Sequence, residues 1–244
     1  MKMQITDMNP FKIIVLIVLF LNCTTNDNDT ILNQPEEKNQ EEKKDFSYLA
    51  LGDSYTIGES VISQNSFPVQ LSKRLESELD IDVETRIIAK TGWRTDDLKN
   101  AITNTRIDIP QDLVTLLIGV NNQYQNKPFE QYEKEFPELL QTALGFVNGN
   151  TEEVLVISIP DYAFTPFGQT RDVDKISTEI DQYNEFAKSI ADKYNITFVE
   201  ITDITRLGLE QPQLVANDGL HPSGEAYGKF VDLILPFVLE GFKD

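Results

Sequence analysis

Two short segments at opposite ends of the sequence contain the residue types needed for an activated nucleophile. Ser54 lies in Gly-Asp-Ser at the end of an apolar run, and His221, the only histidine among 244 residues, follows Asp218-Gly-Leu. A serine hydroxyl is a weak nucleophile until a neighbouring base removes its proton. Unperturbed imidazole titrates at pH ~6.5, so a histidine can act as a base near neutral pH. His221 is the only histidine that this chain offers for that role.

Asp218 could orient that base. It precedes His221 by three residues, so a short loop can fold back until the carboxylate meets the ring Nδ1. Such a bond sets the imidazole tautomer and stabilises the imidazolium that forms during attack. Taken singly, Gly-Asp-Ser also fits a turn or a helix cap, and a lone histidine also fits a surface or packing position. The pairing of the two segments favours nucleophilic catalysis.

A tetrahedral intermediate also needs hydrogen-bond donors aimed at its oxygen. Gly92 precedes a predicted helix that begins at Thr95, and it can present its backbone N–H without a side chain in the way. Asn121 follows a predicted strand and can present its side-chain amide. Each residue also fits an ordinary turn or helix cap, so it gains meaning only beside Ser54 and His221.

Short apolar runs alternate with longer amphipathic segments from Phe46 onward. This alternation predicts parallel strands joined by helical crossovers, and continuous apolar strands predict a sheet covered on both faces. We therefore expect an α/β fold, a three-layer α/β/α sandwich around a five-stranded, mainly parallel sheet. Ligand sites in such sheets lie at the carboxyl ends of the strands, where Ser54, Gly92 and Asn121 fall. Strands are predicted at 48–51, 83–89, 113–118, 154–159 and 196–201, and helices at 67–79, from 95, at 128–147 with a break or kink at Pro137, at 173–194 and at 223–242.

Residues 1–22 are predicted to be a lipoprotein-type signal peptide. Lys2 and Lys12 accompany an unbroken apolar run over 13–21, which is shorter than the roughly 20 residues that cross a bilayer. Such a run fits the central part of a secretory signal. Cys23, the only cysteine, follows it and resembles the lipidated cysteine of bacterial lipoproteins. An ordinary signal peptide and an uncleaved anchor are the alternatives.

Residues 23–45 are polar and charged and have almost nothing to bury, which predicts a flexible tether. Residues 46–244 are then the folded domain. A single cysteine allows no intrachain disulfide, so the core alone must hold this domain together. We expect an exported protein in the bacterial cell envelope, in the periplasm or on the outer surface, that meets the membrane only through a lipid anchor at Cys23.

The composition argues against several other classes. A net charge of −19 does not suit a nucleic-acid partner, which requires clustered Lys and Arg. One histidine and one cysteine make a zinc site unfavourable, and no Walker A or Rossmann glycine motif is present, so neither metal nor cofactor is expected. No Gly-x-Ser-x-Gly elbow surrounds Ser54, which argues against an α/β-hydrolase. Paired-carboxylate glycosidase chemistry stays open, because 40 acidic residues offer many pairs.

The chemistry-bearing segments together resemble the SGNH hydrolases, also called the GDSL esterase/lipase family. That family is named for a serine, a glycine, an asparagine and a histidine in separate blocks. Residues 52–55 resemble the first block, Gly92 the second, 119–122 the third and 218–221 the fifth. Their order and spacing agree across nearly all of 46–244.

The resemblance implies a flavodoxin-like fold and assigns a role to each matching residue. Ser54 would be the nucleophile, His221 the general base and Asp218 its orienting acid. The N–H groups of Ser54 and Gly92 and the amide of Asn121 would form the oxyanion hole.

The sequence departs from the family pattern at three places. Asn122 stands where aspartate is usual, which keeps the hydrogen-bonding capacity but removes the charge. Tyr55 stands where leucine is common, and residues 89–91 lack the Asn-Ala-Gly pattern that often precedes the glycine. The presence of Asn122 in place of aspartate affects the residues that hold the site in position more than it affects the chemistry of the site.

The implied activity is hydrolysis of a carboxylic ester through an acyl-enzyme, with no cofactor and with small, acetyl-type acyl groups favoured. A lysophospholipase or thioesterase acting on lipids, a transferase of the same mechanism and a non-catalytic binding lipoprotein are the alternatives. The loop over 160–171 is the candidate substrate-facing wall. Aromatic side chains in strand-end loops could line a pocket or pack in the core: Tyr55, Trp93, Tyr124, Phe164 and Phe167.

Overall fold

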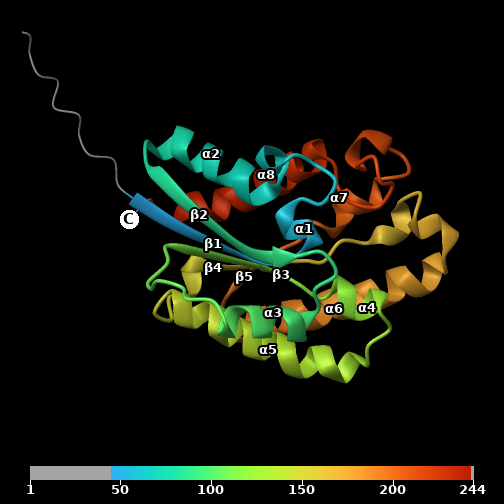
Figure 1. Ribbon diagram of the computed structural model, residues 1–244, viewed down its shortest axis with the longest axis horizontal. Helices are drawn as coiled ribbons and strands as arrows, with labels where there is room; N and C mark the ends of the chain where they lie inside the picture. The colour runs from blue at the N-terminus through green and yellow to red at the C-terminus, as the bar shows by residue number, and fades with distance from the viewer. Residues whose placement is uncertain (1–44, 243–244) are drawn as a thin grey trace, which may run out of the picture. The chain divides into compact units, whose positions relative to one another are not determined.

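The computed structural model describes residues 45–242, which form a five-stranded sheet between two layers of helices (Figure 1). The strand order is β2-β1-β3-β4-β5, and every neighbouring pair is parallel. This flavodoxin-like order has its switch point between β1 and β3, where ligands bind in folds of this kind. The strands are β1 (Asp45–Asp53), β2 (Asp82–Lys90), β3 (Leu113–Leu117), β4 (Val154–Ile157) and β5 (Thr197–Val199).

Burial along the strands follows their place in the sheet. Every residue of β3 and β4 is buried, as expected for inner strands that are covered on both faces. Ile88 is the only buried residue of the edge strand β2, and Val199 is the only one of the opposite edge strand β5. The loops that follow β1 and β3 therefore start from the best-packed part of the sheet.

Helices cover both faces of the sheet. Helices α2 and α8 pack against each other on one face, and α3, α5 and α6 lie on the other (Figure 1). The helices are α1 (Ser54–Ile57), α2 (Phe67–Leu79), α3 (Thr95–Thr103), α4 (Val120–Tyr124), α5 (Phe129–Phe146), α6 (Val173–Lys193), α7 (Thr202–Arg206) and α8 (Gly224–Glu240). Five 3₁₀ turns join them: η1 (Ser63–Asn65), η2 (Thr151–Glu153), η3 (Tyr162–Phe164), η4 (Gly168–Thr170) and η5 (Pro212–Leu214).

The predicted fold class is confirmed, and the helix expected at 67–79 coincides with α2. The predicted break at Pro137 is wrong, because α5 continues through this residue. Phe136, Leu139 and Leu140 are buried beside it, so packing offsets the hydrogen bond that proline cannot make. The strand expected at 196–201 is also shorter than predicted. Ser158 Oγ accepts hydrogen bonds from the N–H groups of residues 201 and 202 and draws the chain out of the sheet.

Candidate active site

The carboxyl ends of three adjacent strands bring the predicted site residues to one edge of the sheet. Because β1 lies between β2 and β3, Ser54 follows the middle strand. Gly92 lies two residues beyond β2 on one side, and Asn121 lies in α4 just beyond β3 on the other. The topology thus places both candidate oxyanion donors beside the candidate nucleophile.

Local geometry fixes Ser54 at the first position of α1. Asp53 ends β1 and caps this helix, since its Oδ1 accepts a hydrogen bond of 3.0 Å from the N–H of Tyr55. A Cβ at Gly52 would come within 2.1 Å of Thr56 Oγ1 and 2.4 Å of the Leu117 carbonyl oxygen. Only glycine therefore allows this close passage of β1 beneath the turn. Ser54 itself is buried, with 3% of its surface exposed.

Asp218 and His221 form the contact that their spacing predicts. Asp218 Oδ2 lies 2.6 Å from His221 Nδ1. Asp218 Oδ1 accepts hydrogen bonds from the backbone N–H groups of Leu220 at 2.9 Å and His221 at 3.0 Å. Gly219 permits this tight turn with a φ of 72°. The carboxylate is thereby held against the imidazole by its own loop.

Hydrogen bonds keep Asp218 ionised. Burial alone would raise the pKa of this carboxyl, but donation from Ser60, His221 and two backbone N–H groups outweighs burial and lowers the pKa to about 2. An ionised Asp218 at neutral pH can stabilise a positive charge on His221.

A short antiparallel bridge fixes the loop that carries His221. Val215 pairs with Pro222, and the N–H of Ala216 donates to the His221 carbonyl oxygen at 2.7 Å. From the other side, the N–H of Phe167 donates to the Gly219 carbonyl oxygen at 2.9 Å. The loop with the candidate base is therefore tied to the segment 160–171, which was expected to face the substrate.

Ser54 and His221 share one pocket of about 250 Å³. The imidazole packs against the ring of Tyr55, with a centroid separation of 5.0 Å. The rest of the lining mixes apolar and aromatic side chains with a few polar groups, as ligand sites do. The lining residues are Ser54, Tyr55, Thr91, Gly92, Val120, Asn121, Tyr124, Tyr162, Phe167, Leu220 and His221.

The five aromatic residues for which the sequence left pocket lining and core packing open divide into two groups. Tyr55, Tyr124 and Phe167 line it. Trp93 and Phe164 instead pack against the hydrophobic core and do not belong to the lining in the described part of the chain. Tyr162 lines the pocket without having been singled out from the sequence, because an aromatic residue at the start of η3 has no distinguishing motif.

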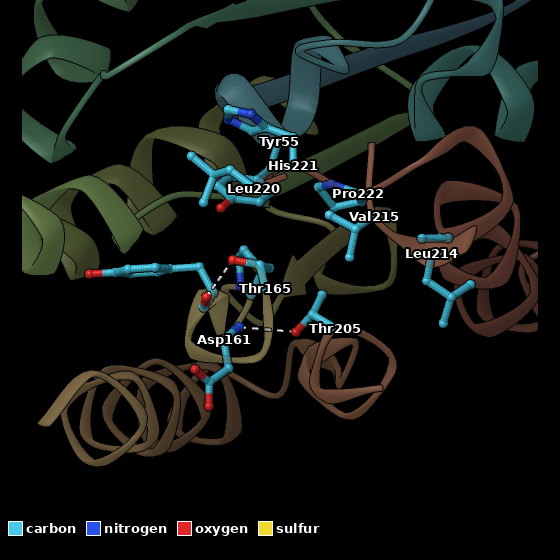
Figure 2. Close-up of a pocket in the computed structure, with 12 residues that line it drawn as sticks. Tyr55, Asp161, Thr165, Thr205, Leu214, Val215, Leu220, His221 and Pro222 are labelled. Atoms are coloured by element: carbon cyan, nitrogen blue, oxygen red, sulfur yellow. Dashed lines mark hydrogen bonds between the residues drawn. The ribbon is translucent and has the colours of Figure 1, made fainter. Parts of the chain in front are cut away.

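A second, much smaller cavity also borders His221 (Figure 2). Its volume of about 10 Å³ has room for roughly one water molecule. Four residues line both cavities and separate them: Tyr55, Tyr162, Leu220 and His221. Figure 2 shows the floor of the small cavity, where the Asp161 N–H donates to Thr205 Oγ1 at 3.0 Å. The larger pocket is therefore the side from which a substrate of any size can reach His221.

Asn121, a candidate oxyanion donor, lines the pocket together with Ser54. Its Nδ2 donates to Asp53 Oδ2 at 3.2 Å, and an amide nitrogen carries two hydrogens, so a second donor is available at the pocket. Asp53 is fully buried, and burial raises the pKa of this carboxyl to about 7, against the hydrogen bonds from Tyr55 and Asn121 that lower it. Asp53 therefore links the nucleophile's turn to the Asn121 amide.

Gly92 lies in the pocket with a φ of 81°. Gln125 Nε2 donates to the Gly92 carbonyl oxygen at 2.8 Å, while Gln125 Oε1 accepts a bond of 2.7 Å from Arg94 Nη1. Gln125 directly follows α4, the helix of Asn121. This side chain therefore connects the two loops that carry candidate oxyanion donors, a function that the sequence alone did not reveal.

The hydrogen bonds of Asn122 explain why asparagine rather than aspartate fits at this position. Asn122 is fully buried, its Oδ1 accepts from the Thr95 N–H at 3.1 Å, and its Nδ2 donates to Thr95 Oγ1 at 2.8 Å. A carboxylate could accept the first bond but could not donate the second. Thr95 Oγ1 in turn donates to the half-buried Glu135, so an amide suits this network without adding a buried charge close to that carboxylate.

The remaining sequence predictions concern residues outside the described part of the chain. The signal peptide at 1–22, the lipidation site at Cys23 and nearly all of the tether at 23–45 fall there, and β1 begins at Asp45. Between residues 45 and 242, no helix has the length and apolar character required to cross a membrane. The same residues hold no cluster of three or more His, Cys, Asp or Glu side chains suited to a metal ion.

Comparison with known protein families shows to which family this chain belongs. Residues 50–229 match the GDSL-like Lipase/Acylhydrolase family. The chain belongs to this family. No curated protein sequence matches the chain.

Several solved structures share the fold. An acetylxylan esterase from Geobacillus stearothermophilus is similar, with a TM-score of 0.63, 20% identity and coverage of 80% of this chain and 95% of that one. TesA gives a TM-score of 0.62 at 16% identity and covers 79% of this chain and 97% of its own. A lipase/acylhydrolase from Enterococcus faecalis gives 0.60 at 20% identity, with 80% and 96% covered. At these identities the likeness establishes the fold.

Proposed function

We propose that this protein is a serine esterase that hydrolyses small acyl esters through an acyl-enzyme. One observation carries the proposal: Ser54 and His221 line the same 250 Å³ pocket, and Asp218 lies 2.6 Å from His221 Nδ1. Membership of the GDSL-like lipase/acylhydrolase family supports ester hydrolysis in general.

The reaction begins with Ser54. Its Oγ attacks the ester carbonyl carbon while His221 Nε2 accepts the hydroxyl proton, and Asp218 stabilises the resulting imidazolium. The carbonyl oxygen becomes an oxyanion that accepts hydrogen bonds from the N–H groups of Ser54 and Gly92 and from the Asn121 amide.

The rest of the reaction takes place in two stages, release of the alcohol and hydrolysis of the acyl-enzyme. The alcohol leaves with the proton that His221 had accepted, and Ser54 remains acylated. Water attacks this acyl-enzyme, with His221 again as the base, and releases the acid. The protein's own side chains and backbone N–H groups supply every acid, base and donor in this reaction, so the reaction requires no cofactor.

The pocket favours short acyl groups. Its volume of about 250 Å³ lies below the roughly 300–1,000 Å³ typical of pockets for drug-sized ligands. Acetyl esters of saccharides fit these dimensions, and the acetylxylan esterase among the similar structures makes acetylated xylan a reasonable test substrate. The apolar part of the lining, including Val120, Phe167 and Leu220, supports a lipid acyl ester or thioester as the second candidate.

A fluorophosphonate probe tests the nucleophile. Labelling of the wild-type protein but not of Ser54→Ala is expected, and equal labelling of both would reject Ser54. A panel of p-nitrophenyl esters from acetyl to palmitoyl, with acetylated xylan and a lysophospholipid, then separates the two substrate classes. A maximum at acetyl supports the first candidate, and a maximum at long chains supports the second.

We further propose that the enzyme is exported and held in the cell envelope by a lipid at Cys23, with the polar segment 23–45 as its tether. The apolar run over 13–21 and the position of Cys23 directly after it support this location. Cys23→Ser is expected to move the exported protein from the membrane fraction to the soluble fraction. Retention of the variant in the membrane fraction would favour an uncleaved anchor.

A further inference from the structure

An exposed guanidinium lies against the aromatic wall of the pocket. Arg171 Cζ lies 4.9 Å from the ring centroid of Tyr124 and 4.6 Å from that of Phe167. Arg171 Nη2 also donates to the Tyr124 hydroxyl oxygen at 3.1 Å. Both aromatic residues line the pocket that holds Ser54 and His221. The guanidinium is therefore fixed beside the site by two rings and one hydrogen bond.

Arg171 forms no salt bridge with any described residue, although the protein has 40 acidic and 21 basic side chains. Asp172, its neighbour in sequence, caps α6 by accepting the Lys175 N–H at 3.1 Å. Four other arginines of the domain are paired with carboxylates: Arg74 with Glu78 and Asp232, Arg94 with Asp96 and Asp97, Arg106 with Asp108, and Arg206 with Asp161 and Asp181. Arg86 also has no carboxylate partner among the described residues, but only Arg171 lies against residues that line the pocket. A guanidinium without a carboxylate partner is thus held against two residues of the pocket wall, Tyr124 and Phe167.

We propose that Arg171 binds a carboxylate carried by the substrate outside the ester bond. This inference rests on the proposed esterase function and narrows its substrate class to carboxylate-bearing esters. A guanidinium presents five N–H donors in a planar fork that matches a carboxylate, and only one of these groups is bound to Tyr124. The Tyr124 hydroxyl keeps its own proton and can donate it to the same substrate anion. Stacking on two rings reduces the side-chain freedom that binding would otherwise remove.

Two acetyl esters of one shape test the proposal. The anion 4-acetoxybenzoate and the neutral 4-acetoxybenzamide share the acyl group and the ring, and they differ in the charge of one substituent. Arg171→Gln is expected to lower kcat/KM for the anion by about fivefold, as for an ion pair exposed to solvent, and to leave kcat/KM for the neutral ester within about twofold. Arg171→Lys keeps the charge without the planar fork and is expected to give an intermediate value.

A matched variant controls for net charge. Arg106→Gln removes the same charge from an exposed side chain in the segment before β3. This segment leads into the amino end of β3, whereas the site lies at the carboxyl ends of the strands. It is expected to leave both esters unaffected. Equal losses on both esters in Arg171→Gln would show that Arg171 only packs the wall, and unchanged values on both would remove it from substrate binding.

A binding measurement needs no turnover. The amide 4-acetamidobenzoate should bind the wild-type protein about fivefold more tightly than neutral 4-acetamidobenzamide by ligand-observed NMR, and Arg171→Gln should abolish the difference. Increasing salt should weaken binding of the anion alone. Equal affinity of the wild-type protein for both ligands would overturn the anion site even if esterase activity is found. A protein that discriminates between them but hydrolyses neither ester and resists the fluorophosphonate would instead overturn the proposed function.

Discussion

Ser60 Oγ lies 2.6 Å from Oδ2 of Asp218, the same oxygen that lies 2.6 Å from His221 Nδ1. Ser60 adopts a φ of 66°, in the left-handed region that residues with a side chain rarely occupy. A hydroxyl donor is therefore held at some conformational cost against the acid of the candidate triad, as is common at functional sites. We regard Ser60 as a positioning residue that acts through Asp218.

Removing the Ser60 hydroxyl should slow turnover without weakening substrate binding. Ser60→Ala is expected to lower kcat by about tenfold, the effect of one lost hydrogen bond to a charged group, with KM nearly unchanged. Steady-state kinetics on p-nitrophenyl acetate measures both constants. Ser60→Gly is the matched control, because glycine accepts the left-handed φ and also lacks the hydroxyl. Recovery of kcat in the glycine variant would mean that strain rather than the lost donor slows the alanine variant.

Asp53 gives the fold a characteristic dependence on pH. Burial raises the pKa of Asp53 from 3.8 to about 7, so the unfolded chain releases this proton at a lower pH than the folded protein. The contribution of Asp53 to stability is therefore complete below about pH 4 and declines as pH rises to about 7. Asp218, whose pKa is lowered to about 2, acts in the opposite direction and below this window.

Urea denaturation of the wild type and Asp53→Asn across this pH range tests the assignment. The wild type should lose a few kcal/mol of unfolding free energy relative to the variant between pH 4 and 7, at about 1.4 kcal/mol for each unit of pKa shift. The variant also places its NH₂ group against one of the two donors, the Tyr55 N–H or the Asn121 amide, which lowers its stability by an amount that does not depend on the ionisation of residue 53. The prediction therefore concerns only how steeply the unfolding free energy changes with pH. Parallel plots of unfolding free energy against pH for the wild type and the variant would contradict the raised pKa of Asp53.

The sequence predicted the order of the elements and the main site residues because both depend on local patterns. Apolar runs mark the inner strands, and the Asp218–His221 contact spans only three residues. The supporting contacts could not be read in this way. Ser60 bonds to Asp218 across 158 positions, and Gln125 reaches Gly92 across 33. Such pairs have no periodicity or motif, since they form only when separate loops meet at the edge of the sheet.

The same reasoning explains where sequence analysis misjudged a residue. Asn122 looked like a weakened version of the usual aspartate, because the sequence does not show that Thr95 offers it both a donor and an acceptor. For Trp93 the sequence left pocket lining and core packing open, and the structure packs its side chain against the core. Position in a strand-end loop fixes the neighbourhood of a residue but leaves the direction of its side chain undetermined.

Restoring the family's usual residue at position 122 should damage this protein. Asn122→Asp loses the donor to Thr95 Oγ1 and adds a buried charge near Glu135, so we expect a loss of about 1–3 kcal/mol in unfolding free energy. Chemical denaturation at pH 8 measures the loss. The double variant Asn122→Asp/Glu135→Gln should recover part of it by removing the second carboxylate. An unchanged stability in the single variant would show that the amide donor is dispensable.

Gln125 should influence catalysis through Gly92. Gln125→Glu keeps the acceptor for Arg94 but places a carboxylate oxygen against the Gly92 carbonyl, so the loop with this candidate oxyanion donor should shift. We expect kcat to fall by about tenfold. Fluorophosphonate labelling of Ser54 should still occur, but more slowly than in the wild type. Gln141→Glu, a charge-matched change at an exposed residue of α5, controls for the added negative charge. A comparable loss in that control would point to charge rather than to the position of Gly92.

Ser54 and His221 should behave as one catalytic unit. His221→Ala removes the only histidine, and Ser54→Ala removes the nucleophile, so each variant is expected to lower kcat on p-nitrophenyl acetate by at least about a thousandfold. The double variant should be no slower than either single variant, because proton transfer from Ser54 has no value without the attack that it enables. Residual hydrolysis in all three would come from the pocket and its oxyanion donors. If the two losses instead multiply in the double variant, the two residues contribute independently, and a mechanism that passes a proton between them is wrong.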